Sequence, residues 1–217
     1  MGLLLYSTGQ KRTLETQGFL VKSDKPIPEE VTTLTGITNQ ALGKFGYESS
    51  SALEIVFDFM NQADAIIGQN VIRFDKRMLY EWAKREGKTV PEKLWIDSRT
   101  DLEIPGKHLQ YMCADEGWLN LFEHSAVADC QSVIKLISKR DIDKIVERAK
   151  SPTIVLVAHQ SRENNQQAKD RKFRWNPDYK IWWKVVKEMD KEAEVTAAPF
   201  NISVAGPEVS LEKLWYD

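Results

Sequence analysis

Alternating hydrophobic and polar positions near the start of the chain predict a β-hairpin. Two strand-like runs, at residues 3–8 and 13–22, flank the polar segment Gly9-Gln10-Lys11. That arrangement is typical of two antiparallel strands joined by a turn. The capping box Ser51-Ala52-Leu53-Glu54 then opens a segment whose apolar residues are spaced three and four apart: Leu53, Val56, Phe57, Met60 and Ala63. This spacing predicts an amphipathic helix over residues 51–63.

Short apolar runs and longer helical patterns alternate through the rest of the first 150 residues. A loop is expected through Pro105-Gly106, where proline and glycine interrupt the pattern. Because strands alternate with helices, this part of the chain is predicted to form an α/β domain with the hairpin at one side of its sheet. Strands are predicted at residues 65–68 and 95–97, and helices at residues 74–87 and 126–137.

The pattern changes after Ser151-Pro152. A hairpin is predicted to turn at Asn176-Pro177-Asp178, since these residue types favour turns. The remaining elements expected here are a strand at 153–158, a polar helix at 163–170, hairpin strands within 173–184 and a strand at 200–204. We therefore divide the chain into a domain at residues 1–150, a small α+β module at 151–205 and a tail at 206–217.

Composition and charge narrow the classes of protein to consider. The 217 residues are 42% hydrophobic, enough to form one sizeable domain and a small one, or two small domains. The net charge is -2, so any basic surface must be local. Cys113 and Cys130 fit no disulfide or metal spacing, which favours a reducing, cytoplasmic location. No apolar run approaches the roughly 20 residues of a membrane span, and no membrane contact is expected.

His124 and Asp129 form the most informative pair of polar residues. Asp129 lies in the first turns of the helix predicted from Ala126, and His124 lies in the loop just before it. A carboxylate at a rigid helix end can bind a metal ion, and a histidine with an ordinary pKa of about 6.5 can accept a proton from water. A surface histidine near a surface aspartate is the alternative interpretation.

Three motifs occur in an order that is more specific than any one of them. They are Leu34-Thr35-Gly36-Ile37-Thr38, then Asn70 with Phe74-Asp75, then His124-x-Ala126-x-x-Asp129. The set resembles the DnaQ-like 3′–5′ exonucleases, the branch known as DEDDh, over about residues 1–150. Ser125 stands where the sister branch carries a tyrosine base, which disfavours that branch.

The resemblance implies an RNase H-like mixed sheet flanked by helices, and a role for each matched residue. It implies that Asp75 and Asp129 bind a pair of Mg²⁺ or Mn²⁺ ions, that His124 is the general base, and that Asn70 contacts nucleic acid. Two such ions, about 4 Å apart, activate water and stabilise the leaving oxygen. Asp97, at the end of a predicted strand, is expected to have a structural role rather than to bind metal.

The first motif of the family, Asp-x-Glu on its first strand, has no match before Asp75. The chain opens on Met1-Gly2-Leu3-Leu4-Leu5-Tyr6, which resembles the second strand of the family. Asp101-Leu102-Glu103 and Asp190-Lys191-Glu192 come after Asp75, and chance explains them in a chain with 32 acids. Three interpretations remain: the chain is clipped relative to the functional gene product, it is a degenerate relative, or a partner chain supplies the strand.

A basic and aromatic segment lies within the small module. Residues 162–187 hold eight Lys or Arg against three acids, a local excess of +5. A binding site for single-stranded nucleic acid needs aromatic rings on which bases stack and cations that pair with the phosphates. Trp175 and Trp182 are expected to belong to the core of the module. The residues predicted to contact nucleic acid are Arg174, Lys180, Trp183 and Lys184.

The leading hypothesis is a metal-dependent 3′–5′ exonuclease acting on single-stranded DNA 3′ ends, with weak turnover because the first-strand carboxylates are missing. The alternative is a catalytically inactive exonuclease-fold protein that binds nucleic acid or serves as an adaptor. A third hypothesis is a nuclease-like subunit that docks on a protein partner through the tail. The apolar residues Leu211 and Leu214 of the tail are expected to pack back onto the body of the protein.

Overall fold

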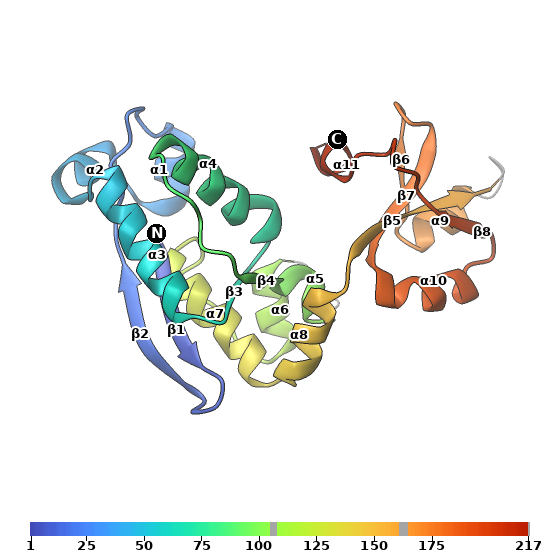
Figure 1. Ribbon diagram of the computed structural model, residues 1–217, viewed down its shortest axis with the longest axis horizontal. Helices are drawn as coiled ribbons and strands as arrows, with labels where there is room; N and C mark the ends of the chain where they lie inside the picture. The colour runs from blue at the N-terminus through green and yellow to red at the C-terminus, as the bar shows by residue number, and fades with distance from the viewer. Residues whose placement is uncertain (105–107, 161–164, 217) are drawn as a thin grey trace. The chain divides into compact units, whose positions relative to one another are not determined.

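The computed structural model divides the chain into two compact units, Met1–Ala149 and Lys150–Asp217 (Figure 1). It describes residues 1–104, 108–160 and 165–216. The loop predicted through Pro105-Gly106 and the start of the helix predicted at 163–170 therefore lie outside the described residues. Across the described ranges, no helix combines the length and the apolarity that a membrane span needs.

The first unit opens with the predicted hairpin. Strands β1 (Gly2–Ser7) and β2 (Arg12–Gly18) pair antiparallel, with Gly2 opposite Gly18 and a register irregularity between Leu5 and Tyr6. Lys11 in the turn has a φ of 52°, a left-handed conformation that closes tight connections. The hairpin predicted from the alternating pattern is confirmed.

A second pair of strands lies in the same unit. Strands β3 (Ala65–Gly68) and β4 (Leu94–Asp97) run parallel, with Gly68 opposite Asp97. Parallel strands end at the same edge, so the segments that follow Gly68 and Asp97 lie side by side. Within the described residues no ladder joins this pair to the hairpin, and each sheet has two strands (Figure 1).

Helices cover both strand pairs and supply most of the core of the unit. The predicted amphipathic helix is α3 (Ser49–Gln62), whose Leu53 is fully buried. Helix α7 (Ala126–Ser138) packs against β1, β2 and β3, and its Leu136 is also fully buried. The other elements are α1 (Glu29–Thr35), α2 (Asn39–Phe45), the π-helical turn η1 (Ile72–Lys76), α4 (Arg77–Arg85), α5 (Ser98–Asp101), α6 (Leu109–Asp115) and α8 (Ile142–Lys150).

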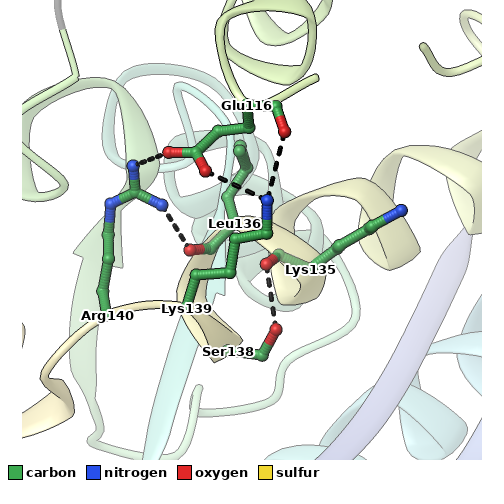
Figure 2. A network of polar contacts seen from close by, with 6 residues as sticks. All are labelled: Glu116, Lys135, Leu136, Ser138, Lys139 and Arg140. Atoms are coloured by element: carbon green, nitrogen blue, oxygen red, sulfur yellow. Dashed lines mark hydrogen bonds and ion pairs between the residues drawn. The ribbon is translucent and has the colours of Figure 1, made fainter. Parts of the chain in front are cut away.

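A network of ion pairs ties the end of α6 to the end of α7. Figure 2 shows Glu116 between Lys139 and Arg140. The Lys139 Nζ donates to Glu116 Oε2 at 3.2 Å and to the Glu116 carbonyl at 3.1 Å, and Arg140 Nη1 donates to the Leu136 carbonyl at 2.6 Å. The bonds from Arg140 and Lys139 lower the pKa of the Glu116 carboxyl. The network thus fixes the C-terminal end of α7.

Glu116→Gln is expected to lower the free energy of unfolding by about 1 kcal/mol at pH 7. A carboxyl whose pKa is lowered by folding stabilises the protein above its unfolded pKa, and this contribution is lost as the pH falls through the folded pKa. The difference between variant and wild type in urea unfolding should therefore shrink towards pH 4 and below. Asp115→Asn, at the exposed neighbouring acid, is the control, and an equal effect there would contradict this assignment.

The second unit is a four-stranded antiparallel sheet in the order β6-β7-β5-β8. Strand β6 pairs with β7 through Trp175 opposite Trp182, which confirms the predicted hairpin. Trp182 and Trp183 are both buried, and as neighbours on a strand they enter opposite faces of the sheet. The elements are β5 (Thr153–His159), α9 (Asn165–Asp170), β6 (Arg174–Asn176), β7 (Ile181–Lys187), the 3₁₀ turn η3 (Glu188–Asp190), α10 (Lys191–Ala197), β8 (Asn201–Val204) and α11 (Leu211–Tyr216).

The end of the chain packs onto this second unit, as predicted. Leu214 of α11 is 1% exposed and belongs to a cluster with Val155 and Trp183. Leu211 is packed against the same cluster. Leu211 and Leu214 therefore cover one face of the small sheet.

Candidate active site

Asp75 lies where the chain leaves β3 and turns into the next helix. Asn70 has a φ of 55°, and residues from Ile72 onwards form the π-helical turn η1, a rare form that is frequent at functional sites. The Asp75 side chain reaches solvent, yet the surrounding protein reduces its hydration and raises the pKa of its carboxyl. The nearby negative charge of Asp97 raises that pKa further.

Asp97 holds this turn in place from the end of β4. Its Oδ1 accepts hydrogen bonds from the backbone N–H of Asn70 at 2.9 Å and of Arg99 at 3.0 Å, and its Oδ2 accepts from the N–H of Ile72 at 3.3 Å. The side chain is 3% exposed, and burial raises the pKa of its carboxyl despite these bonds. The predicted structural role of Asp97 is confirmed by these contacts.

His124 and Asp129 lie at the start of α7. His124 has a φ of 62° and an exposed side chain in the loop just before the helix. The Asp129 Oδ1 accepts a hydrogen bond from Asn120 Nδ2 at 2.8 Å. Burial raises the pKa of the Asp129 carboxyl, while the bond from Asn120 and the charge of His124 oppose that rise. Asn120 orients the carboxylate, and no motif in the sequence marked it for this role.

The charges of Asp75 and Asp129 both reach the thiol of Cys130, so the two carboxylates lie in the same part of the first unit. Burial raises the pKa of this thiol to about 11, and the negative charges of Asp129 and Asp75 add to the rise. Residues 54 positions apart in sequence therefore act on one side chain. The Cys130 Sγ lies 3.4 Å from the Gly2 carbonyl, where β1 meets α7. A Cβ at Gly2 would lie 2.4 Å from the Ala126 carbonyl carbon, so only glycine fits there.

The donor set suits a hard divalent cation but is small. Carboxylate oxygens are the ligands that Mg²⁺ and Mn²⁺ prefer, and Asp75 and Asp129 supply them. With a pKa of about 11, the Cys130 thiol stays protonated near neutral pH and is a poor ligand. Among the described residues, no group of three or more His, Cys, Asp or Glu has a metal-holding arrangement. Two carboxylates alone would supply only part of the ligand set that such an ion needs.

Asn70 lies beside this group, and its side chain has a protein partner. Its Oδ1 accepts a hydrogen bond from Arg99 Nη1 at 3.3 Å. The side chain is partly exposed at the edge where β3 and β4 end. The predicted contact of Asn70 with nucleic acid stays a prediction.

In the second unit, the four residues predicted to contact nucleic acid differ in their exposure to solvent and in their partners. Arg174 and Lys180 are exposed. Trp183 is 7% exposed in the core, so its ring offers no free face and its predicted stacking role is wrong. Lys184 Nζ pairs with Glu194 Oε2 at 2.7 Å.

The two tryptophans predicted to lie in the core also differ from each other. Trp182, at 9% exposed, is in the core as predicted. Trp175 is 49% exposed, so its predicted place in the core is wrong. The reason is that Trp175 lies on the edge strand β6, which has a neighbour on one side only, while Trp182 lies on the inner strand β7.

Comparisons with known proteins identify the family and the fold. The RNase T exonuclease family model matches residues 6–137, more than half of the chain. The chain is similar to E. coli Exonuclease I, solved in complex with a dA16 oligonucleotide, with a TM-score of 0.54 and 17% sequence identity over 70% of this chain and 42% of that one. It therefore spans less than half the length of that protein. No curated protein matches. The predicted RNase H-like mixed α/β fold is confirmed.

Proposed function

Because this chain belongs to the RNase T exonuclease family, within the DnaQ-like group, we propose that it removes nucleotides from the 3′ ends of single-stranded DNA. The observation that carries this proposal is the placement of Asp75 in the turn η1 after β3, of Asp129 at the start of α7 and of His124 in the loop just before it, with the charges of both acids reaching Cys130. The oligonucleotide bound to the similar Exonuclease I supports a single-stranded substrate. The reaction is hydrolysis of a phosphodiester.

Each residue of the site has a task in that reaction. His124 accepts a proton from the attacking water, whose oxygen bonds to phosphorus while the bond to the 3′ oxygen breaks. The released 3′ oxygen takes up a proton, which leaves a shortened strand and a nucleoside 5′-monophosphate. Asp75 and Asp129 would hold Mg²⁺ or Mn²⁺, which when bound lowers the pKa of water and stabilises charge on the phosphate. Asn120 and Asp97 keep the two carboxylates in position.

The test is digestion of a single-stranded oligonucleotide labelled at its 5′ end. Incubation with the full chain and Mn²⁺ should give a ladder of labelled products, because nucleotides leave from the 3′ end. A chelator or a blocked 3′ end should prevent the ladder. Turnover should be slow, since two carboxylates hold a cation weakly. Release of the labelled 5′ nucleotide first, or an unchanged rate in chelator, would overturn the proposal.

A second candidate is a nucleic-acid-binding protein without catalytic activity on the same scaffold. The absence of a third metal-ligating group among the described residues favours it. On this hypothesis the affinity for single strands falls steeply with salt, stays the same when Asp75 and Asp129 are neutralised, and is accompanied by no digestion at any concentration of Mn²⁺. The digestion assay separates the two candidates directly.

A further inference from the structure

The edge strand β6 presents a tryptophan that the core of the second unit leaves half uncovered. Trp175 is 49% exposed and lies opposite Trp182 in the ladder. The two ring centroids are 5.8 Å apart with an interplanar angle of 57°. Trp182 is buried in a cluster with Phe173 and Leu156. A packed neighbour therefore orients the Trp175 ring, while half of its surface remains accessible to a ligand.

Cations flank this ring along the chain. Lys172 precedes it and Lys180 follows at the end of the turn, and both are exposed. Among the described residues, no ion pair involves either lysine. Their charges are therefore available to an anionic ligand at the ring. Arg174 lies opposite Trp183 in the ladder, so its side chain leaves from the other face of the sheet.

A further cationic group lies on the same face of the sheet as Trp175. Lys184 is two residues beyond Trp182 on β7, so its side chain projects from the same face. Its Nζ lies 5.7 Å from the centre of the Phe173 ring and pairs with Glu194, which also accepts from Arg171 Nε at 2.9 Å. Two cations share one carboxylate, so this cluster keeps a positive charge beside the exposed tryptophan.

We propose that this surface, the β6 platform formed by Trp175 with Lys172 and Lys180, binds single-stranded nucleic acid. One base stacks on Trp175, and the neighbouring phosphates pair with the flanking cations. Every base has a flat face, so the platform accepts any sequence. This inference rests on the proposed function in one respect only, namely that the ligand is a nucleic acid. The platform lies in a different unit from Asp75 and Asp129, so binding does not depend on those carboxylates.

The stacking contact is tested by the fluorescence anisotropy of a labelled oligo-dT titrated with the full chain in chelator. Trp175→Ala should weaken binding by roughly 5- to 100-fold, the range expected when one stacked base is no longer held. Trp175→Phe, which keeps a ring, should restore most of the affinity. Met189→Ala is the matched control, because Met189 is 50% exposed in the same unit. Thermal unfolding should be the same for all three variants.

The pairing of cations with phosphates is tested by the salt dependence of the same titration. In Lys172→Ala/Lys180→Ala, the slope of log affinity against log salt should become shallower by about 0.7 for each phosphate that the variant no longer neutralises. Trp175→Ala should leave that slope unchanged, as should Lys191→Ala at an exposed lysine of α10. The two kinds of variant thus separate stacking from charge.

Two outcomes would overturn the platform. If Trp175→Ala binds the oligo-dT with an affinity within about twofold of the wild type, the ring does not stack on a base and contacts something else, such as a protein surface. An equal loss in Met189→Ala means that the effect is not specific to the ring. Failure of the proposed nuclease is recognised separately, because binding by the platform is measured in chelator and needs no cleavage.

Discussion

His124→Ala is expected to lower the rate of metal-dependent digestion by about 100- to 10,000-fold, the usual contribution of a general base. The exposed imidazole is adjacent to Asp129 at the start of α7 and is the group available to take a proton from water. Initial rates on a 5′-labelled oligonucleotide with saturating Mn²⁺ measure the effect. His108→Ala, at another exposed histidine of the same unit, should keep full activity. Equal rates for wild type and His124→Ala would remove His124 from the mechanism.

Asp129→Asn should lose at least as much activity as His124→Ala while the fold becomes slightly more stable. Folding raises the pKa of this carboxyl from its ordinary 3.8, so its ionisation costs stability at every pH above the folded pKa. The neutral variant should therefore unfold at a temperature higher by on the order of 2 °C near pH 7. That gain should vanish as the pH falls towards 3.8. A variant that is inactive and less stable at pH 7 would indicate a structural role instead.

Asp97→Ala is expected to lower the free energy of unfolding of the first unit by about 3 kcal/mol, because three backbone N–H groups lose their acceptor. Asp97→Asn keeps one carbonyl oxygen and should cost about half as much. Urea unfolding followed by circular dichroism measures both. Asp64→Ala, at an exposed acid just before β3, should change the stability by less than about 0.5 kcal/mol.

Activity distinguishes the positioning role of Asp97 from the roles of the catalytic residues. Without its bonds to Asn70 and Ile72, the turn that carries Asp75 is free to move, so digestion should slow even under conditions where the variant is fully folded. A higher concentration of Mn²⁺ should partly restore the rate of Asp97→Asn. If Asp97→Ala were as stable as the wild type, the hydrogen bonds assigned to this carboxylate would not contribute as described.

The elements of the first unit were predictable wherever the apolar residues recur with one clear period along the chain. The apolar spacing of residues 51–63 and the alternation of the hairpin each allow one arrangement, and the structure has it. The ordered motifs also identified the family, because their order survives where overall identity is low. The hydrogen bond between Asn120 and Asp129 could not be predicted, since it depends on how a loop without any pattern folds back.

The second unit shows where pattern alone fails. Trp182 and Trp183 are adjacent, so alternation cannot tell which of them faces outward, and both are buried because α11 covers the second face. Trp175 is also a tryptophan, but it lies on the edge strand β6 and is exposed. Which strand lies at the edge depends on the order of strands in the sheet. The partner of Lys184 is Glu194, ten residues later on another element. Strand order and helix docking are properties of the tertiary fold.

Helix α7 has a mechanical consequence for the first unit. It touches both strand pairs, and within the described residues no backbone ladder joins those pairs. Sliding of one pair past the other is therefore resisted by side-chain packing rather than by backbone hydrogen bonds. This packing involves α7 and also the core cluster around α3, which contacts Leu3 of β1 and Ile66 of β3. Because α7 also carries Asp129, a displacement of this helix relative to β3 would move Asp129 relative to the turn that carries Asp75.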